Sequence, residues 1–149
     1  MNLHVVRTDG SWYSRPDITL VRDADRFCLP DDCISALACR CRCIRIDKAG
    51  KAIAPRFARR YFSSWAPGIC FYGVLADGAV TPYLDRATWV SRDFRPVEEL
   101  PDVAFAPIIE GIESVSRHVS LRIGDFLMFE LSLPAPLKRG DTIDTISIL

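Results

Sequence analysis

The segment "ALACRCRCIRI", residues 36–46, alternates small or apolar side chains with charged ones in a chain of 149 residues. Side chains two residues apart on a β-strand point to the same face of the sheet. We therefore expect Cys39, Cys41 and Cys43 to lie on one face, and the arginines between them to lie on the other. The alternation predicts a strand over residues 36–46, and an isoleucine-rich end continues it toward the core.

The chemistry of sulfur leaves two interpretations of this cysteine row. In the first, each thiol is a small buried hydrophobic side chain of the core. In the second, Cys39, Cys41 and Cys70 bind a soft metal such as zinc, although zinc sites usually place C-x2-C pairs in turns rather than on a flat strand. Disulfides between neighbours in the row are disfavoured, because a strand rises about 3.3 Å per residue and the side chains are parallel. The pattern favours core packing.

The overall composition excludes several classes of partner. The 19 Lys and Arg residues balance the 19 Asp and Glu residues, so no net charge attracts nucleic acid or an anionic membrane. The sequence contains neither a signal-peptide pattern nor an apolar run that could span a bilayer. Its six cysteines are then most simply reduced thiols. We expect a cytoplasmic protein with one domain over residues 1–149, and no nucleic-acid or membrane partner.

Hydrophobic periodicity predicts a strand-rich chain with two helices. Apolar residues recur at helical intervals in residues 53–62 and 106–118, although Gly111 weakens the second helix. The helices do not alternate regularly with the strands, which favours an α+β fold over a doubly wound sheet. Strands or extended segments are predicted at residues 3–6, 14–23, 27–32, 36–46, 68–78, 87–94, 121–131 and 141–149.

Five segments of the sequence, taken in order, carry a resemblance to a known family. They are "RPDITLVRDADRFCLPDD" (15–32), "GKAIAPRFARRYFSSWAPGICFYGVLAD" (50–77), "FRPVEEL" (94–100), "VSLRIGDFLMF" (119–129) and "PLKRGDTID" (136–144). These segments resemble landmarks of the fumarylacetoacetate hydrolase family, particularly its shorter bacterial members, and the resemblance covers nearly the whole chain. It implies a mixed, curved β-sheet of the β-roll type with two short helices.

The resemblance also implies where a metal site would lie. Family members use a divalent cation, usually magnesium or calcium, to act on β-dicarbonyl or 2-oxo acid substrates as hydrolases, isomerases or decarboxylases. Two glutamates of a Glu-x-Glu element and a later aspartate hold the cation, and hard cations need such oxygen ligands. By the spacing from the Gly50-Lys51 and Gly68 landmarks, the glutamate positions fall on Cys39 and Cys41, and the aspartate position falls on Cys70.

Other parts of the family's catalytic machinery are also replaced. The family's Ala-Arg-Asp element is here Gly73-Val74-Leu75, and its Gly-Thr-Pro turn is replaced by "ELSLPAP" (130–136). The lysine expected shortly before residue 87 is missing, and the N-terminal loop between Val6 and Trp12 is shortened. The resemblance therefore implies a scaffold without catalytic residues, and the lone histidines His4 and His118 give no support to a Cys-His hydrolase.

These observations predict a non-catalytic homologue with no cofactor and a binding or regulatory role. We expect it to form a homodimer or to pair with a paralogue, as the family's dimers imply. The alternative is an enzyme with altered chemistry, in which Cys39, Cys41 and Cys70 hold zinc or another soft metal, or in which one of them is a nucleophile.

Overall fold

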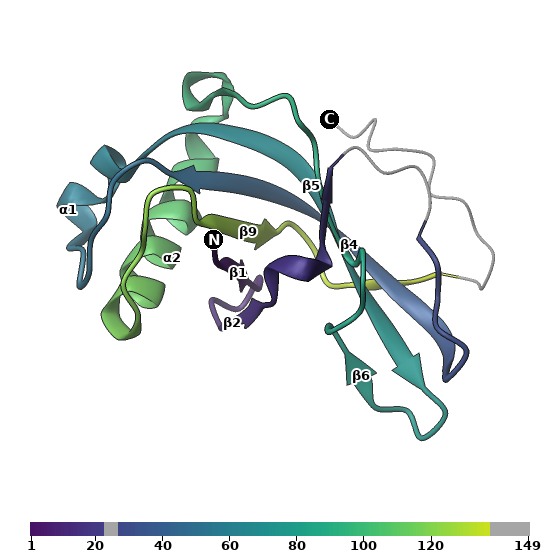
Figure 1. Ribbon diagram of the computed structural model, residues 1–149. Helices are drawn as coiled ribbons and strands as arrows, with labels where there is room; N and C mark the ends of the chain where they lie inside the picture. The colour runs from purple at the N-terminus through teal and green to yellow at the C-terminus, as the bar shows by residue number, and fades with distance from the viewer. Residues whose placement is uncertain (23–26, 138–149) are drawn as a thin grey trace.

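The computed structural model describes residues 1–22 and 27–137. Two long antiparallel strands, β4 (Cys33–Ile46) and β5 (Phe62–Leu75), form the centre of the sheet and bend along their length (Figure 1). β4 contains the alternating segment, and its residues pair with β5 from Cys33 to Ile46 with two register shifts. The predicted strand at residues 36–46 is therefore confirmed and extends three residues further toward the N-terminus.

Shorter strands complete a ten-stranded mixed sheet in the described residues. The main order is β2-β1-β9-β4-β5-β7-β3, while β10 pairs with β4, and β6 and β8 pair with β5. The β1–β9 and β3–β7 pairs are parallel and the others are antiparallel. The strands are β1 (Leu3–Val6), β2 (Trp12–Arg15), β3 (Leu20–Arg22), β6 (Val80–Thr81), β7 (Thr88–Val90), β8 (Arg95–Pro96), β9 (Phe126–Glu130) and β10 (Ala135–Leu137).

Two α-helices flank the sheet, and one of them covers a face of it. α1 (Pro55–Ala58) is a single turn, and α2 (Phe105–His118) has the helical apolar spacing that the sequence predicts. Ile108, Ile112 and Val115 of α2 are buried against the side of the sheet that carries Ile44 and Leu127. We call this side the helix face (Figure 1). The described residues also contain four 3₁₀ turns: Asp17–Thr19, Arg59–Tyr61, Val97–Glu99 and Asp102–Ala104.

The opposite side of the sheet, the cysteine face, has its own core. Cys39, Cys41 and Cys43 of β4 pack there in one cluster with Phe126 and Met128 of β9. Successive side chains of β9 point to opposite faces of the sheet: Leu127 packs on the helix face, between Phe126 and Met128 on the cysteine face. The predicted α+β class and the curved mixed sheet with two short helices are confirmed.

Three predicted elements differ from the structure: the strand at 27–32, the helix at 53–62 and the start of the strand at 68–78. Residues 27–30 contain no regular structure, so the strand predicted at 27–32 is wrong; Pro30 lacks an N–H and its carbonyl accepts the Cys33 N–H in a turn. The helix predicted at 53–62 shortens to α1 and a 3₁₀ turn, because β5 begins at Phe62 instead of near residue 68. The end of the extended segment predicted at 14–23 and the strand predicted at 141–149 lie outside the described residues.

Within the described ranges, every helix is too short or too polar to cross a lipid bilayer.

Candidate functional site

The cysteine row lies at the centre of the cysteine face. Cys39, Cys41 and Cys43 are 3 %, 1 % and 0 % exposed, and Cys70 of β5 is fully buried directly opposite Cys39. The strand alternation thus places the three cysteines of β4 together, as predicted, and the β4–β5 register adds Cys70 to the group. The structure brings together the three positions where the resemblance puts metal ligands.

The thiols in this row interact with one another and with backbone carbonyls. The Sγ atom of Cys39 lies 3.2 Å from the Ser132 carbonyl oxygen, and the Sγ atom of Cys41 lies 3.5 Å from the Cys39 carbonyl oxygen. Burial raises the pKa of Cys41 and of Cys43 well above that of an ordinary thiol. The hydrogen bond from Cys41 lowers the pKa of Cys39. Cys39 is therefore more acidic than Cys41 and Cys43, the other two thiols of the row.

A chain of polar side chains crosses the cysteine face beside this row. The Arg15 Nε–H donates to the Tyr13 hydroxyl at 2.9 Å, and the Tyr13 hydroxyl donates to the Tyr72 hydroxyl at 2.8 Å. The Tyr72 hydroxyl in turn donates to a carboxylate oxygen of Glu130. These residues come from β2, β5 and β9, so the chain connects three strands that are distant in sequence. We call it the Arg15–Glu130 chain.

Arg15 is a buried cation with unusual partners. It is 3 % exposed, and no carboxylate lies within ion-pair distance of it in the described part of the chain. Its guanidinium donates to the carbonyls of Phe71 and Ala87, both at 2.9 Å, and lies 4.8 Å from the centre of the Tyr72 ring. Burial acts to lower the pKa of Arg15, but the neighbouring Cys70 thiol and Tyr13 hydroxyl outweigh it and raise that pKa overall.

The pKa values of the other members of the Arg15–Glu130 chain are shifted in favour of their protonated forms. Burial raises the pKa of Tyr13 to about 12 and also raises the pKa of Tyr72. Burial likewise raises the pKa of the Glu130 carboxyl, although its hydrogen bond from Tyr72 acts in the opposite direction. A hydroxyl and a carboxyl that lie side by side can recognise a ligand that donates or accepts hydrogen bonds.

A cavity of about 400 Å³ opens beside the Glu130 end of this chain. Tyr72 and Glu130 line it on one side, while Leu37, Val80 and Leu133 supply an apolar wall. This volume lies within the range of small-molecule sites, which is about 300–1,000 Å³. The cavity is therefore large enough to accept a small ligand on the cysteine face.

The Arg15–Glu130 chain was not predicted from the sequence. Tyr13 and Arg15 are two residues apart on a strand, which places them on one face. Their approach to Tyr72 and Glu130, however, depends on pairings between distant strands. β2 pairs with β1, and β1 pairs in parallel with β9, which lies near the other end of the polypeptide. Pairings between distant strands leave no local pattern in the sequence.

Comparison with solved structures gives consistent neighbours. A fumarylpyruvate hydrolase from Pseudomonas aeruginosa, in complex with Mn²⁺ and pyruvate, superposes with a TM-score of 0.72 over 94 % of this chain and 82 % of its own, at 14 % identity. A fumarylacetoacetate hydrolase family protein from Yersinia pestis CO92 gives a TM-score of 0.76 over 93 % and 84 % of the two chains, at 16 % identity. The chain has the fumarylacetoacetate hydrolase fold.

A third neighbour adds to this result. The maleylpyruvate hydrolase from Sphingobium sp. SYK-6, in complex with manganese(II) and pyruvate, gives a TM-score of 0.75 at 15 % identity and covers 91 % of this chain and 62 % of its own. No protein-family model matches the sequence, and no curated protein matches it. At these identities the likeness is one of fold.

The side chains of the cysteine row do not fit a hard cation such as the Mn²⁺ of those two hydrolases. Mg²⁺ and Mn²⁺ prefer carboxylate, carbonyl and water oxygens, whereas thiolates select softer metals. Cys41 is buried with a raised pKa, so it offers a neutral thiol near neutral pH. Over residues 1–22 and 27–137, no group of three or more His, Cys, Asp or Glu side chains is arranged to hold a metal ion.

Proposed function

We propose that this chain is a non-catalytic relative of the fumarylacetoacetate hydrolases that has kept their fold for a binding or regulatory role. The observation that carries the proposal is the burial of Cys39, Cys41 and Cys70 in one apolar cluster, at the positions where the resemblance puts carboxylate ligands. Without oxygen ligands, no Lewis acid would be held there to polarise a substrate carbonyl.

The energetics of the core support the same proposal. A cluster of buried carboxylates without a cation suffers both desolvation and mutual repulsion. Thiols remove both costs, because they are neutral and of low polarity. Cys39, Cys41 and Cys70 would therefore stabilise a fold that no longer depends on a bound ion.

The binding role would use the cavity of about 400 Å³ beside the Arg15–Glu130 chain. Its polar end presents the Tyr72 hydroxyl and the Glu130 carboxyl, and its apolar wall presents Leu37, Val80 and Leu133. A small molecule with a polar head and an apolar body matches this division. The protonated form of Glu130, which its raised pKa favours, could donate a hydrogen bond to such a head group.

Mn²⁺ binding is the experiment that tests the non-catalytic proposal. Electron paramagnetic resonance of free Mn²⁺ would be followed on titration with the wild-type chain, and hydrolysis of an acylpyruvate would be assayed in parallel. We expect neither Mn²⁺ depletion nor turnover. Stoichiometric Mn²⁺ binding together with turnover would contradict the proposal.

A triple variant tests whether the three positions are equivalent to metal ligands. Cys39→Glu, Cys41→Glu and Cys70→Asp together should create Mn²⁺ binding, seen as Mn²⁺-dependent thermal stabilisation. The matched control carries Gln, Gln and Asn at the same positions, which keeps the size of the side chains and removes their charge. Equal behaviour of the two triple variants would show that these positions do not form a carboxylate site.

The alternative, an enzyme with altered chemistry, is favoured by one observation. The lowered pKa of Cys39 distinguishes it from the neighbouring thiols and would increase its thiolate fraction. Two measurements on reduced protein test this alternative: elemental analysis for zinc, and the rate of Cys39 alkylation by iodoacetamide. Stoichiometric zinc, or alkylation of Cys39 well above the rate of a free thiol, would favour it over the non-catalytic proposal.

We also propose that the chain acts as a homodimer or pairs with a paralogue in the cytoplasm. Sedimentation equilibrium would measure the mass of the purified chain. A pull-down from the native host that recovers a chain of the same fold with intact carboxylate ligands would identify a paralogous partner. A monomer at all concentrations, with no such chain recovered, would contradict this part of the proposal.

A further inference from the structure

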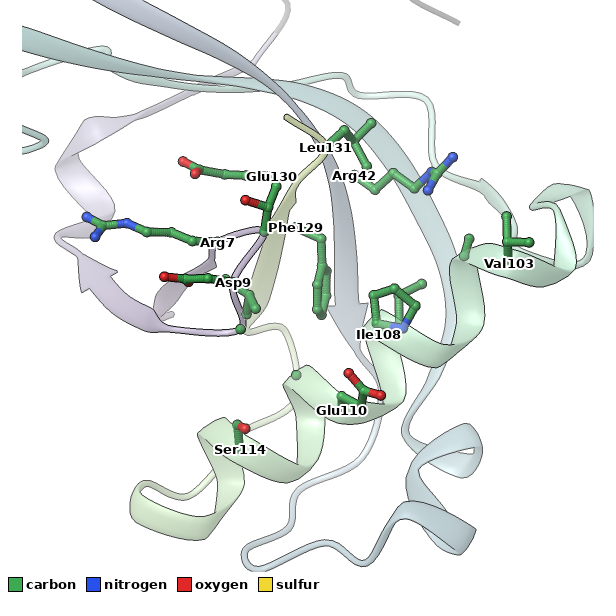
Figure 2. A pocket seen from close by; sticks show the side chains of 16 residues that line it. Arg7, Asp9, Arg42, Val103, Ile108, Glu110, Ser114, Phe129, Glu130 and Leu131 are labelled. Atoms are coloured by element: carbon green, nitrogen blue, oxygen red, sulfur yellow. The ribbon is translucent and has the colours of Figure 1, made fainter. Parts of the chain in front are cut away.

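A second cavity, of about 420 Å³, lies on the helix face of the sheet, away from the cysteine row. Its floor is apolar and consists of Phe129 of β9 and Ile108 of α2, while Val103 and Leu131 stand at its edge. Figure 2 shows it between α2 and the end of β9, with Arg42 extending from the sheet above Ile108. We call it the helix-face cavity.

Arg42 is the polar feature of this cavity that lacks a partner. It follows Cys41 on β4, so alternation turns it to the helix face, opposite Phe129 in the β4–β9 register. Its Nε atom is buried without a hydrogen-bond partner, and no ion pair to its guanidinium occurs within residues 1–22 and 27–137. Burial lowers the pKa of Arg42, yet arginine stays charged at neutral pH.

Arg42 is half-buried, but its buried Nε–H has no acceptor, and a buried donor without an acceptor destabilises a folded chain unless something outside the chain supplies one. Three acidic residues line the cavity. Glu110 lies on α2 at the exposed rim, and Asp9 is exposed between β1 and β2, where its carboxylate accepts the Ser11 N–H and hydroxyl. The Glu130 side chain belongs to the cysteine face through its bond from Tyr72, and in Figure 2 it points away from α2, as does Arg7. No acidic side chain of the described chain therefore neutralises Arg42.

We propose that the helix-face cavity binds a small monocarboxylate with an apolar body, its carboxylate on the Arg42 guanidinium and its body on Phe129 and Ile108. A guanidinium offers two parallel N–H donors that match a carboxylate. The buried Nε–H of Arg42 would gain its missing acceptor. The apolar floor selects a hydrocarbon or aromatic body over a compact inorganic anion such as phosphate.

This inference does not depend on the proposed function. The two cavities share the lining residues 7–9 and Glu130, but their floors lie on opposite faces of the sheet. A metal-binding enzyme on the cysteine face would leave Arg42 without a partner as well. Failure of the Mn²⁺ experiments and failure of the carboxylate experiment can therefore be told apart.

Hexanoate is the probe, and hexanamide is its neutral isostere. Both would be titrated into ¹⁵N-labelled wild-type protein by NMR. Hexanoate should shift the backbone amides of Gly111 and Phe129 and the Nε–H resonance of Arg42, and it should bind about tenfold or more tightly than hexanamide, since a charge-assisted pair is lost with the amide. This comparison requires no variant.

Two variants localise the effect. Arg42→Met should fold as well as the wild type, because it removes an unpartnered charge, and it should lose hexanoate binding by about tenfold or more. Arg40→Met is the control, since Arg40 is exposed on the same strand and does not line the cavity. Glu110→Gln should tighten hexanoate binding by removing a negative charge from the rim.

The proposal is overturned by any of three results: equal affinity for hexanoate and hexanamide, unchanged hexanoate binding in Arg42→Met, or shifts confined to the Tyr72 and Glu130 resonances of the opposite face. Inorganic phosphate is titrated as a further probe. Binding of phosphate as tight as that of hexanoate would show a general anion site and would also overturn the assignment of a monocarboxylate with an apolar body.

Discussion

At the scale of single residues, two arginines of the described chain, Arg15 and Arg42, lack carboxylate partners. Arg15 is buried among carbonyl oxygens and aromatic rings, and Arg42 reaches over a cavity. The two cases differ in their hydrogen bonds, because each guanidinium nitrogen of Arg15 has an acceptor whereas the Nε of Arg42 has none. Arg15 is therefore a structural cation, and Arg42 is a cation that can accept a ligand.

Removal of Arg15 should be costly. Arg15→Leu would leave the carbonyls of Phe71 and Ala87 without this donor inside the core. We expect a loss of about 3 kcal/mol or more in the free energy of unfolding, as for a buried charge network that loses one member. Urea unfolding measures the loss, with Arg40→Leu as an exposed control that should change stability by less than about 0.5 kcal/mol. Equal effects of the two changes would show that the Arg15 contacts contribute nothing.

Glu130 should make stability depend on pH in a defined direction. Burial raises its pKa in the folded chain, so folding favours the protonated carboxyl. Its contribution is therefore complete below the pKa of an unfolded glutamate, near 4.5, and is lost as pH rises through the higher folded value. Glu130→Gln removes this titration, since glutamine cannot ionise.

Urea unfolding of wild type and Glu130→Gln across pH 4–8 tests this direction. The stability of the variant relative to the wild type should increase as pH rises. A constant difference between the two proteins would mean that the Glu130 pKa is not raised by folding.

At the scale of elements, a strand or helix is predicted correctly where its buried residues follow the local hydrophobic pattern. β4 alternates and is two-sided, and α2 repeats apolar residues at helical spacing, so both are predicted correctly. β5 begins six residues earlier than predicted. Ser63, Ser64 and Pro67 have low strand propensity, so the sequence does not indicate a strand at this point. Pro67 is tolerated there because its carbonyl accepts the Ser91 N–H, although it cannot donate to the ladder.

Gly111 shows how packing outweighs helix propensity. Glycine inside a helix costs about 1 kcal/mol relative to alanine. At this position, however, an added Cβ would overlap the ring of Phe129, which is itself buried. The glycine therefore allows α2 to pack closely against β9, at a cost in helix propensity.

Gly111→Ala should accordingly destabilise the protein. We expect a net loss of about 1–2 kcal/mol in the free energy of unfolding, in which strain against Phe129 exceeds the gain in helix propensity. Thermal or urea unfolding measures it. In a double-mutant cycle, Phe129→Leu should relieve the strain, so the Gly111→Ala change should cost less in that background. A stabilising Gly111→Ala would show that the ring moves freely.

At the scale of the whole molecule, the sequence predicts which residues share a face but not which faces meet. Cys39, Cys41 and Cys43 are grouped correctly because alternation is local. Cys70 joins them only through the β4–β5 register, and Glu130 joins the Arg15–Glu130 chain only through β9. The resemblance predicted the fold class. Neither cavity was predicted, because both lie between elements that are far apart in the sequence.

The identity of the side chain at residue 41 should then govern the stability of the entire domain. Cys41→Glu places a carboxylate at a site that is 1 % exposed and lies beside the Cys39 and Cys70 thiols. We expect a loss of about 3–5 kcal/mol at neutral pH. Because burial would raise the pKa of that carboxyl, part of the loss should be recovered as pH falls and the carboxyl is protonated.

The melting temperature measured from pH 4 to pH 8 tests this prediction against Cys28→Glu, which replaces an exposed cysteine and should be nearly neutral throughout. Mn²⁺ should not restore Cys41→Glu, since one carboxylate among thiols is a poor site for a hard cation, whereas it should stabilise the triple variant that carries three carboxylates. If Cys41→Glu were as stable as wild type at pH 8, residue 41 would have to be reached by water or by a cation. The cysteine face would then be an open site, and the interpretation of its thiols as core would be wrong.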